Sequence, residues 1–116
     1  MMKTFYKKVL GVIGGGQLGK MICMEATRMG IQVVVFSDVK NSPALHLSNK
    51  YFISSYSNKK ELIKFAKICD VITYEFENIP LETIRFLKKY TNIYPNISAL
   101  KISQDRLKEK RFIKNL

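Results

Sequence analysis

Apolar residues follow two alternating patterns along this chain of 116 residues. Short continuous apolar runs predict buried β-strands, and stretches in which apolar residues recur every three or four positions predict helices packed on a sheet. The predicted strands are 8–14, 31–37, 51–56, 70–76 and 92–95. The predicted helices are 17–29, a short one at 41–47, then 58–69, 80–90 and 98–116. Alternation of strands and helices is typical of a parallel α/β sheet with helices on its faces.

Capping residues mark the ends of several predicted helices. Gly30 is placed to end the first helix, and Ser42 with Pro43 is placed to begin the short one. Ser57 and Asn58 are alternative caps for the helix that follows. In the first helix the apolar positions suit packing on a sheet; they are Leu18, Met21, Ile22, Met24 and Ala26.

A glycine-rich stretch, "GVIGGGQLGK" at 11–20, joins the first strand to the first helix. Gly14, Gly16 and Gly19 fit the G-x-G-x-x-G pattern of dinucleotide-binding turns. Asp38 follows at the spacing of a ribose-binding acid. Glycines permit close approach of a ligand to the backbone, and a helix N-terminus offers unpaired N–H groups and a positive dipole end. The pattern alone favours a dinucleotide site. The alternative is that the glycines only permit a tight connection from strand to helix and bind no ligand.

Composition narrows the class of protein. With 47% hydrophobic and 25% charged residues, and a length that fits one domain, the chain is expected to fold as a soluble unit. Its net charge of +11 is spread over nearly every segment, so a nucleic-acid partner is not expected. Neither a signal peptide nor a membrane span is expected. Cys23 and Cys69 lack further ligands at metal spacing and are expected to be reduced, buried thiols of a cytoplasmic protein without a metal site.

Three segments together resemble one enzyme family. They are "GGGQLGKM" at 14–21, "DVITYEFENIP" at 70–80 and "SQDRLKEKRFI" at 103–113. In this order they resemble the N-terminal part of the 5-(carboxyamino)imidazole ribonucleotide synthetases, ATP-dependent ligases of purine biosynthesis in the ATP-grasp superfamily. The resemblance covers nearly the whole chain. It implies a Rossmann-like parallel sheet flanked by helices, similar to the N-terminal domain of biotin carboxylase and called the pre-ATP-grasp domain.

The resemblance reassigns the glycine turn from a dinucleotide to the substrate of this family, aminoimidazole ribonucleotide. It implies that Gly16, Gln17 and Leu18 line the substrate pocket, with Gln17 contributing its side-chain amide. Glu75, at the end of the fourth strand, is implied to accept hydrogen bonds from the ribose or the amino group, with Glu77 as the alternative.

The complete family reaction uses MgATP and bicarbonate to carboxylate aminoimidazole ribonucleotide. Arg106 matches an arginine that contacts the ATP phosphates, but no other ATP-grasp element is present, so no catalytic residue is expected and neither ATP nor Mg²⁺ is expected to bind this chain alone. Residues 1–98 are predicted to form the substrate-binding domain, and 99–116 a helical linker into an absent ATP-grasp domain.

The chain alone is therefore expected to be inactive, as a fragment of the ligase or the product of a split or decayed gene. Its implied partners are the ribonucleotide, the missing ATP-grasp portion and, through the larger domains, a second copy in a homodimer. A small Rossmann-type dinucleotide-binding module remains the alternative function.

Overall fold

The computed structural model describes residues 8–74 and 79–95, in which strands and helices alternate. The strands are β1 (Val9–Ile13), β2 (Gln32–Ser37), β3 (Lys50–Ile53), β4 (Val71–Tyr74) and β5 (Asn92–Ile93). The helices are α2 (Gln17–Arg28), α3 (Lys59–Ile68) and α4 (Leu81–Leu87), with the short 3₁₀ helix η1 (Pro43–Leu47) before β3. The helix predicted at 98–116 lies outside the described residues.

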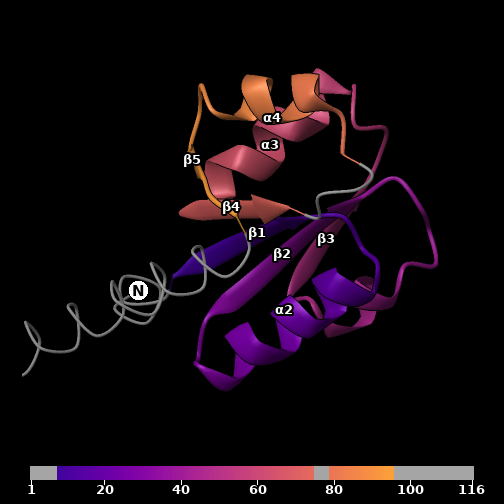
Figure 1. Cartoon of the computed structure of the whole chain (residues 1–116), viewed down its shortest axis with the longest axis vertical. Helices are drawn as coiled ribbons and strands as arrows, with labels where there is room; N and C mark the ends of the chain where they lie inside the picture. The colour runs from indigo at the N-terminus through magenta and orange to yellow at the C-terminus, as the bar shows by residue number, and fades with distance from the viewer. Residues whose placement is uncertain (1–7, 75–78, 96–116) are drawn as a thin grey trace, which may run out of the picture.

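The described strands form one parallel sheet in the order β3-β2-β1-β4-β5. α2 covers one face of this sheet, and α3 and α4 cover the other (Figure 1). The chain builds outward from β1 in both directions, because β2 and β3 lie on one side of it and β4 and β5 on the other. The predicted α/β class and parallel sheet are confirmed.

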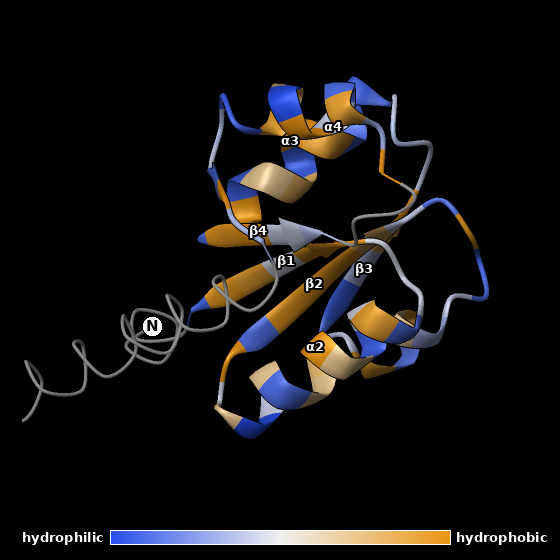
Figure 2. Ribbon diagram, in the orientation of Figure 1, coloured by the Kyte–Doolittle hydropathy of each residue, from blue (hydrophilic) through white to orange (hydrophobic). Residues whose placement is uncertain are grey.

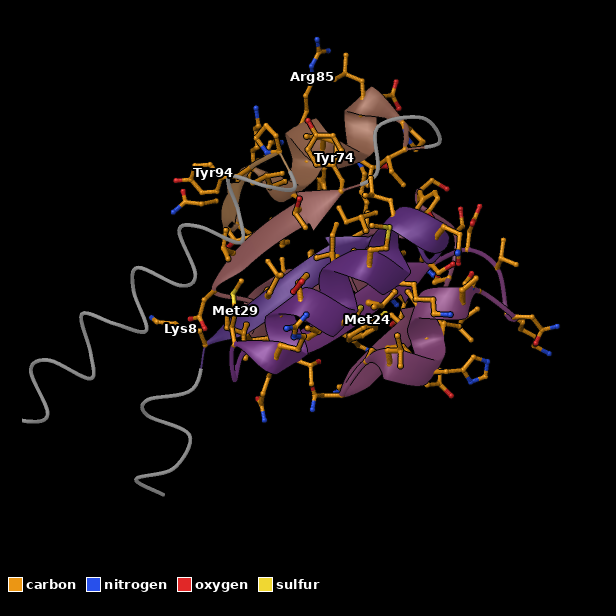
Figure 3. All side chains as sticks on the ribbon, turned by 60° about the horizontal axis from the view of Figure 1, so that its bottom comes forward. Lys8, Met24, Met29, Tyr74, Arg85 and Tyr94 are labelled. Carbon is orange, nitrogen blue, oxygen red and sulfur yellow. The ribbon has the colours of Figure 1, made fainter. Side chains whose placement is uncertain are left out.

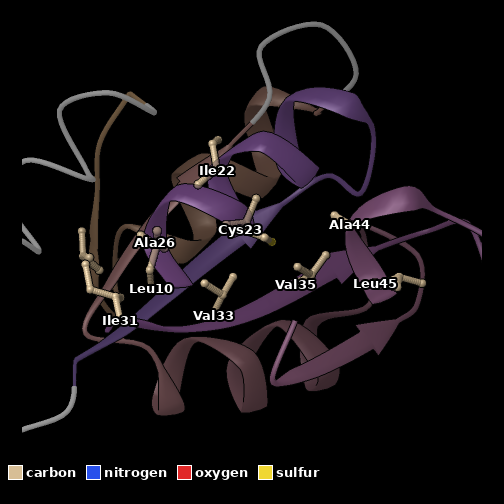
Figure 4. Packing of buried hydrophobic residues seen from close by; sticks show 11 residues of the cluster. Leu10, Ile22, Cys23, Ala26, Ile31, Val33, Val35, Ala44 and Leu45 are labelled. Atoms are coloured by element: carbon tan, nitrogen blue, oxygen red, sulfur yellow. The ribbon is translucent and has the colours of Figure 1, made fainter. Parts of the chain in front are cut away.

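Each face of the sheet has its own hydrophobic core, because side chains alternate between faces along a strand. The core under α2 combines apolar residues of β1, β2, β4 and η1 with those of the helix (Figure 4). The core under α3 and α4 includes the rings of Phe36, Phe52 and Phe65, with centroids 5.4 to 6.0 Å apart. The central strands are covered on both faces, which is why they are hydrophobic along most of their length (Figure 2).

α2 packs on the sheet through a narrow face. Four residues spaced three or four apart form it: Gly19, Ile22, Cys23 and Ala26. Three further apolar positions that the sequence pattern assigned to packing are exposed instead: Leu18, Met21 and Met24. At about 100° of rotation per residue, positions 21 and 24 fall on the side of the helix opposite the buried face.

Local signals at helix ends were predicted with mixed success. Gly30 follows the end of α2 with a φ of 78°, in the left-handed region that glycine adopts without strain. Asn58 is the N-cap of α3, and its side-chain oxygen accepts a hydrogen bond from the Glu61 N–H at 3.3 Å. Ser42 precedes η1 but its hydroxyl does not cap that helix.

Two polar side chains extend the strand pairing at the amino end of the sheet. Asp70, just before β4, accepts a hydrogen bond from the Val9 N–H at 2.8 Å, and its own N–H donates to the Val9 carbonyl at 2.9 Å. Asn49, just before β3, makes the same pair of bonds with Val33, at 2.8 and 2.9 Å. Each pair aligns an incoming strand with its neighbour and so helps to fix its register.

Candidate functional site

The carboxyl ends of β1 and β4 are the point at which the chain leaves the sheet toward opposite faces. β1 is followed by α2 on one face, whereas the next helix after β4 is α4 on the other (Figure 1). Open parallel sheets bind ligands in the crevice outside the strand ends at such a topological switch point. The glycine turn, residues 14–16, directly follows β1 there. By this rule the candidate site is the edge of the sheet formed by the carboxyl ends of β1 and β4, and this edge is called the β1–β4 crevice below.

The glycine turn is held by backbone bonds and by close packing. Gly14 has a φ of 106°, and its N–H donates to the Phe36 carbonyl at 2.8 Å. The Gly15 carbonyl accepts a hydrogen bond from the Ala44 N–H at 2.9 Å. A Cβ atom on Gly15 would lie 2.3 Å from the Cβ of Ser42, closer than real atoms approach. Glycine is required at position 14 by conformation and at position 15 by space.

Two buried serines, Ser37 and Ser42, pack against Gly15 of the turn. The hydroxyls of Ser37 and Ser42 lie 2.7 Å apart. Ser37 Oγ accepts from the Val39 N–H at 3.1 Å, and Ser42 Oγ donates to the Val39 carbonyl at 2.9 Å. With Ser37 donating to Ser42, these bonds close a ring that satisfies both hydroxyls. This ring is the reason why Ser42 does not cap η1.

The N-terminus of α2 lies at this edge, directly after the glycine turn. Gly16 is its N-cap, no side chain caps the first turn, and no acidic residue lies in that turn. Gln17 and Leu18 follow with exposed side chains. The positive dipole end of the helix and the N–H groups of Gln17 and Leu18 thus lie at this edge without an anion from the same turn, an arrangement that suits a phosphate or carboxylate.

Most predicted site residues within the described segments lie at this edge. Gly16, Gln17 and Leu18 are at the first turn of α2, and the exposed Asp38 comes directly after β2 at the same edge of the sheet. Three predicted residues lie outside the described residues, and their roles stay predictions: Glu75, Glu77 and Arg106.

Sequence reasoning did not assign the hydroxyl side chains beneath the turn to the site, and named Ser42 only as a helix cap. They are Ser37, Ser42 and Thr73, all buried. Ser37 and Ser42 belong to the hydrogen-bonded ring, whereas the Thr73 hydroxyl has no hydrogen-bond partner within residues 8–74 and 79–95. A polar residue at an inward-facing position of an otherwise apolar strand was the available signal.

Two buried thiols lie away from this edge. Burial raises the pKa of Cys23 to about 11, and burial together with the nearby Asp70 carboxylate raises the pKa of Cys69 further. Both are therefore neutral near pH 7. Among the described residues, no three or more His, Cys, Asp or Glu side chains are grouped to hold a metal ion. No helix in the same segments has the length and apolar composition to cross a membrane.

A cavity of about 190 Å³ lies between the start of α3 and α4. Its lining includes Tyr56, Leu62 and Phe86, and the Lys59 ammonium lies 5.6 Å from the centre of the Phe86 ring. No residue of the glycine turn lines this cavity. It is separate from the β1–β4 crevice.

The family model of the ribonucleotide synthetase preATP-grasp domain matches residues 7–104. Among proteins of known function, the N5-carboxyaminoimidazole ribonucleotide synthases of Brucella melitensis and Staphylococcus aureus are 40% and 38% identical to this chain, over 115 and 113 residues. The matches cover 97% of this chain in both cases. The chain spans 32% and 30% of the length of those two relatives.

Solved structures show the same similarity. The N5-carboxyaminoimidazole synthetase from Staphylococcus aureus complexed with ADP has a TM-score of 0.71 and 39% identity, covering 93% of this chain and 30% of that one. The synthase from Aspergillus clavatus in complex with ADP and 5-aminoimidazole ribonucleotide has a TM-score of 0.66 and 32% identity, covering 84% of this chain and 26% of that one.

Proposed function

The chain belongs to the ribonucleotide synthetase preATP-grasp domain family, and we propose that it binds aminoimidazole ribonucleotide as the N-terminal domain of a cytoplasmic N5-carboxyaminoimidazole ribonucleotide synthase. The observation that carries this proposal is the geometry of the β1–β4 crevice, where a glycine turn and an open helix N-terminus meet at the switch point of the sheet. The similar Aspergillus synthase, solved with 5-aminoimidazole ribonucleotide, supports the choice of ligand.

Three residues of the described edge have distinct roles in this proposal. The Gln17 side-chain amide hydrogen-bonds a polar group of the ribonucleotide, and the exposed Leu18 packs against its apolar surface. Gly16 carries no side chain over the first turn of α2, so the N–H groups of Gln17 and Leu18 are available to an anionic group of the ligand.

Two further roles rest on the resemblance and on position in the sequence. Glu75 comes directly after β4, next to the strand that leads into the glycine turn, and is proposed to accept hydrogen bonds from the ribose or amino group, with Glu77 as the alternative. Arg106 is proposed to contact the ATP phosphates in the complete enzyme.

The chemistry of the complete enzyme requires a portion beyond this domain. In that enzyme, MgATP supplies the energy to activate bicarbonate, and the activated carboxyl group is transferred to the amino group of the ribonucleotide. We propose that this chain binds and orients the ribonucleotide, that an ATP-grasp portion carries out the transfer, and that the complete enzyme is a homodimer.

A dinucleotide-binding module is the second candidate, and the placement of Asp38 favours it. Its carboxylate follows β2 at the edge that carries the glycine turn, where a ribose-binding acid is found in dinucleotide-binding folds. The two candidates differ in ligand, because only the first requires aminoimidazole ribonucleotide.

Titration calorimetry on the purified chain tests the proposal. We expect aminoimidazole ribonucleotide to bind and NAD and NADP not to bind. Gln17→Ala should weaken ribonucleotide binding about tenfold, the loss of one hydrogen bond to a charged or polar ligand. Gln32→Ala is the matched control, because Gln32 lies at the amino end of β2, at the other edge of the sheet. It should leave the affinity unchanged.

Bicarbonate-dependent ATP hydrolysis measured on the same preparation should be absent. Binding of NAD or NADP without binding of the ribonucleotide would overturn the proposal in favour of the dinucleotide module. Hydrolysis by the chain alone would show that its role is not limited to binding.

A further inference from the structure

Thr73 lies at the base of the β1–β4 crevice. It belongs to β4 and pairs in register with Val12 of β1, the strand that leads into the glycine turn. Val71, two residues earlier, packs in the core under α2, whereas Tyr74 packs on the opposite side of the sheet, with α4 (Figure 3). Because side chains alternate along a strand, the Thr73 side chain lies on the α2 face.

A single row of residues separates Thr73 from the edge of the sheet. Ile13, which follows Val12, pairs with Tyr74, and Gly14 begins the turn immediately beyond them. Successive rows on one face of a strand are about 7 Å apart. Thr73 is thus one row below the glycine turn and the first turn of α2, directly under the switch point.

The hydroxyl of Thr73 has no hydrogen-bond partner among the described residues. The side chain is 0% exposed and its Oγ1 atom makes no hydrogen bond. A buried hydroxyl left unpaired destabilises a fold, and valine has the same shape without that cost. Thr83, the other buried threonine among the described residues, differs: its hydroxyl donates to the Tyr56 carbonyl at 2.8 Å. The fold therefore accounts for the hydroxyl of Thr83 but not for that of Thr73.

We propose that Thr73 is a positioning residue of the substrate site, whose hydroxyl gains its hydrogen-bond partner when a ribonucleotide occupies the crevice. The partner is a polar atom that the ligand brings to the base of the crevice, either its own or that of a water trapped beneath it. This inference rests on the proposed function. In a buried site of low dielectric the new bond is strong, and it fixes how deeply the ligand sits.

Two substitutions at this position separate a ligand-related hydroxyl from a structural one. Thr73→Val removes the unpaired hydroxyl, so the melting temperature should rise by about 5 °C while the affinity for aminoimidazole ribonucleotide falls about five- to tenfold. Thr73→Ser keeps the hydroxyl but loses a methyl group, so the melting temperature should fall while the affinity stays within about twofold of the parent. Of the two variants, Thr73→Val should therefore be the more stable and Thr73→Ser the tighter binder. A purely structural role of the hydroxyl does not produce this opposition.

Thr83→Val is the matched control. It removes a hydroxyl that already has a partner, so it should lower the melting temperature and leave ribonucleotide affinity unchanged. Melting is followed by circular dichroism and affinity by calorimetry on the same samples.

Three outcomes would overturn the inference, and they are distinguishable. If the parent binds the ribonucleotide and Thr73→Val binds it equally well, Thr73 positions nothing, although the proposed function stands. If Thr73→Val is less stable than the parent, the hydroxyl already has a structural partner. If the parent chain does not bind the ribonucleotide, the proposed function fails and this inference fails with it.

Discussion

Gly15 and Ser42 show how closely the glycine turn packs on the segment before η1. A Cβ atom at position 15 would lie 2.3 Å from the Ser42 Cβ and 2.7 Å from its Oγ. The Gly15 carbonyl and the Ala44 N–H are bonded at 2.9 Å, so the two segments have little freedom to separate. Glycine at position 15 therefore allows two segments 27 residues apart in the sequence to pack together, and this requirement is independent of any ligand.

Gly15→Ala should destabilise the protein by about 2 kcal/mol, the range expected when an atom is forced into a packed interior. Ser42→Gly removes the two atoms that clash, so the alanine should cost at least about 1 kcal/mol less in that background. Urea denaturation of the two single variants and the double variant measures the coupling.

Gly11→Ala is the control for this cycle. Its Cβ would meet Cys69 Sγ at 2.5 Å and Phe65 at 2.8 Å, on the other face of the sheet. It should therefore cost the same with or without Ser42→Gly. Equal costs for Gly15→Ala in the two backgrounds would show that Ser42 is not the obstacle.

At the scale of the elements, polar side chains at the amino end of the sheet hold the incoming strands. Asn49 and Asp70 lie just before β3 and β4, and each makes a two-way pair of hydrogen bonds with the neighbouring strand. One is an amide and the other a carboxylate, yet both use a side-chain oxygen as the acceptor. We therefore expect that an oxygen acceptor at this position is sufficient, whether or not it carries a charge.

Asn49→Ala leaves the N–H of the buried Val33 without an acceptor, so unfolding free energy should fall by about 1 to 2 kcal/mol. Asn49→Asp keeps an oxygen in the same place and should retain most of the stability. Chemical denaturation of the two variants tests this. A loss of stability in Asn49→Asp as large as in Asn49→Ala would contradict the role of the oxygen.

At the scale of the whole molecule, the described residues form two cores divided by the sheet, and each core contains one thiol. Cys23 lies under α2 and Cys69 under α3 and α4. Burial raises the pKa of Cys23 to about 11 and raises that of Cys69 further. Because the unfolded chain ionises these thiols from about pH 9, it holds fewer protons than the folded chain above that pH.

Stability should consequently be unaffected by the thiols below about pH 9 and fall as pH rises toward 11, by up to about 1.4 kcal/mol per pH unit for each thiol. Denaturation curves at pH 8, 9 and 10 measure this slope. A Cys23→Ala, Cys69→Ala double variant is less stable at pH 8 because it leaves two cavities, but its slope should be shallower. The same slope in the parent and the double variant would assign the alkaline loss to other groups.

The sequence determined the local structure, because the signals for it lie within a few residues. Alternating apolar runs predicted the strands, their parallel arrangement and the helices between them, and Gly30 and Asn58 marked helix ends correctly. The glycine turn was located between the first strand and helix, where the structure has it. The three motifs in order also predicted the family that the comparisons show.

The contacts of individual side chains were determined only by the tertiary structure. Periodicity showed that α2 is amphipathic, but its contact with the sheet buried Gly19, Ile22, Cys23 and Ala26 and left Met21 and Met24 exposed. The sequence predicted Ser42 as a helix cap. In the fold its hydroxyl hydrogen-bonds to that of Ser37 instead. The sequence shows Thr73 as a polar residue in an otherwise apolar strand, but it does not show whether the hydroxyl has a partner. The position of Thr73 under the switch point depends on pairing with Val12, 61 residues away, and no local pattern encodes a contact at that separation.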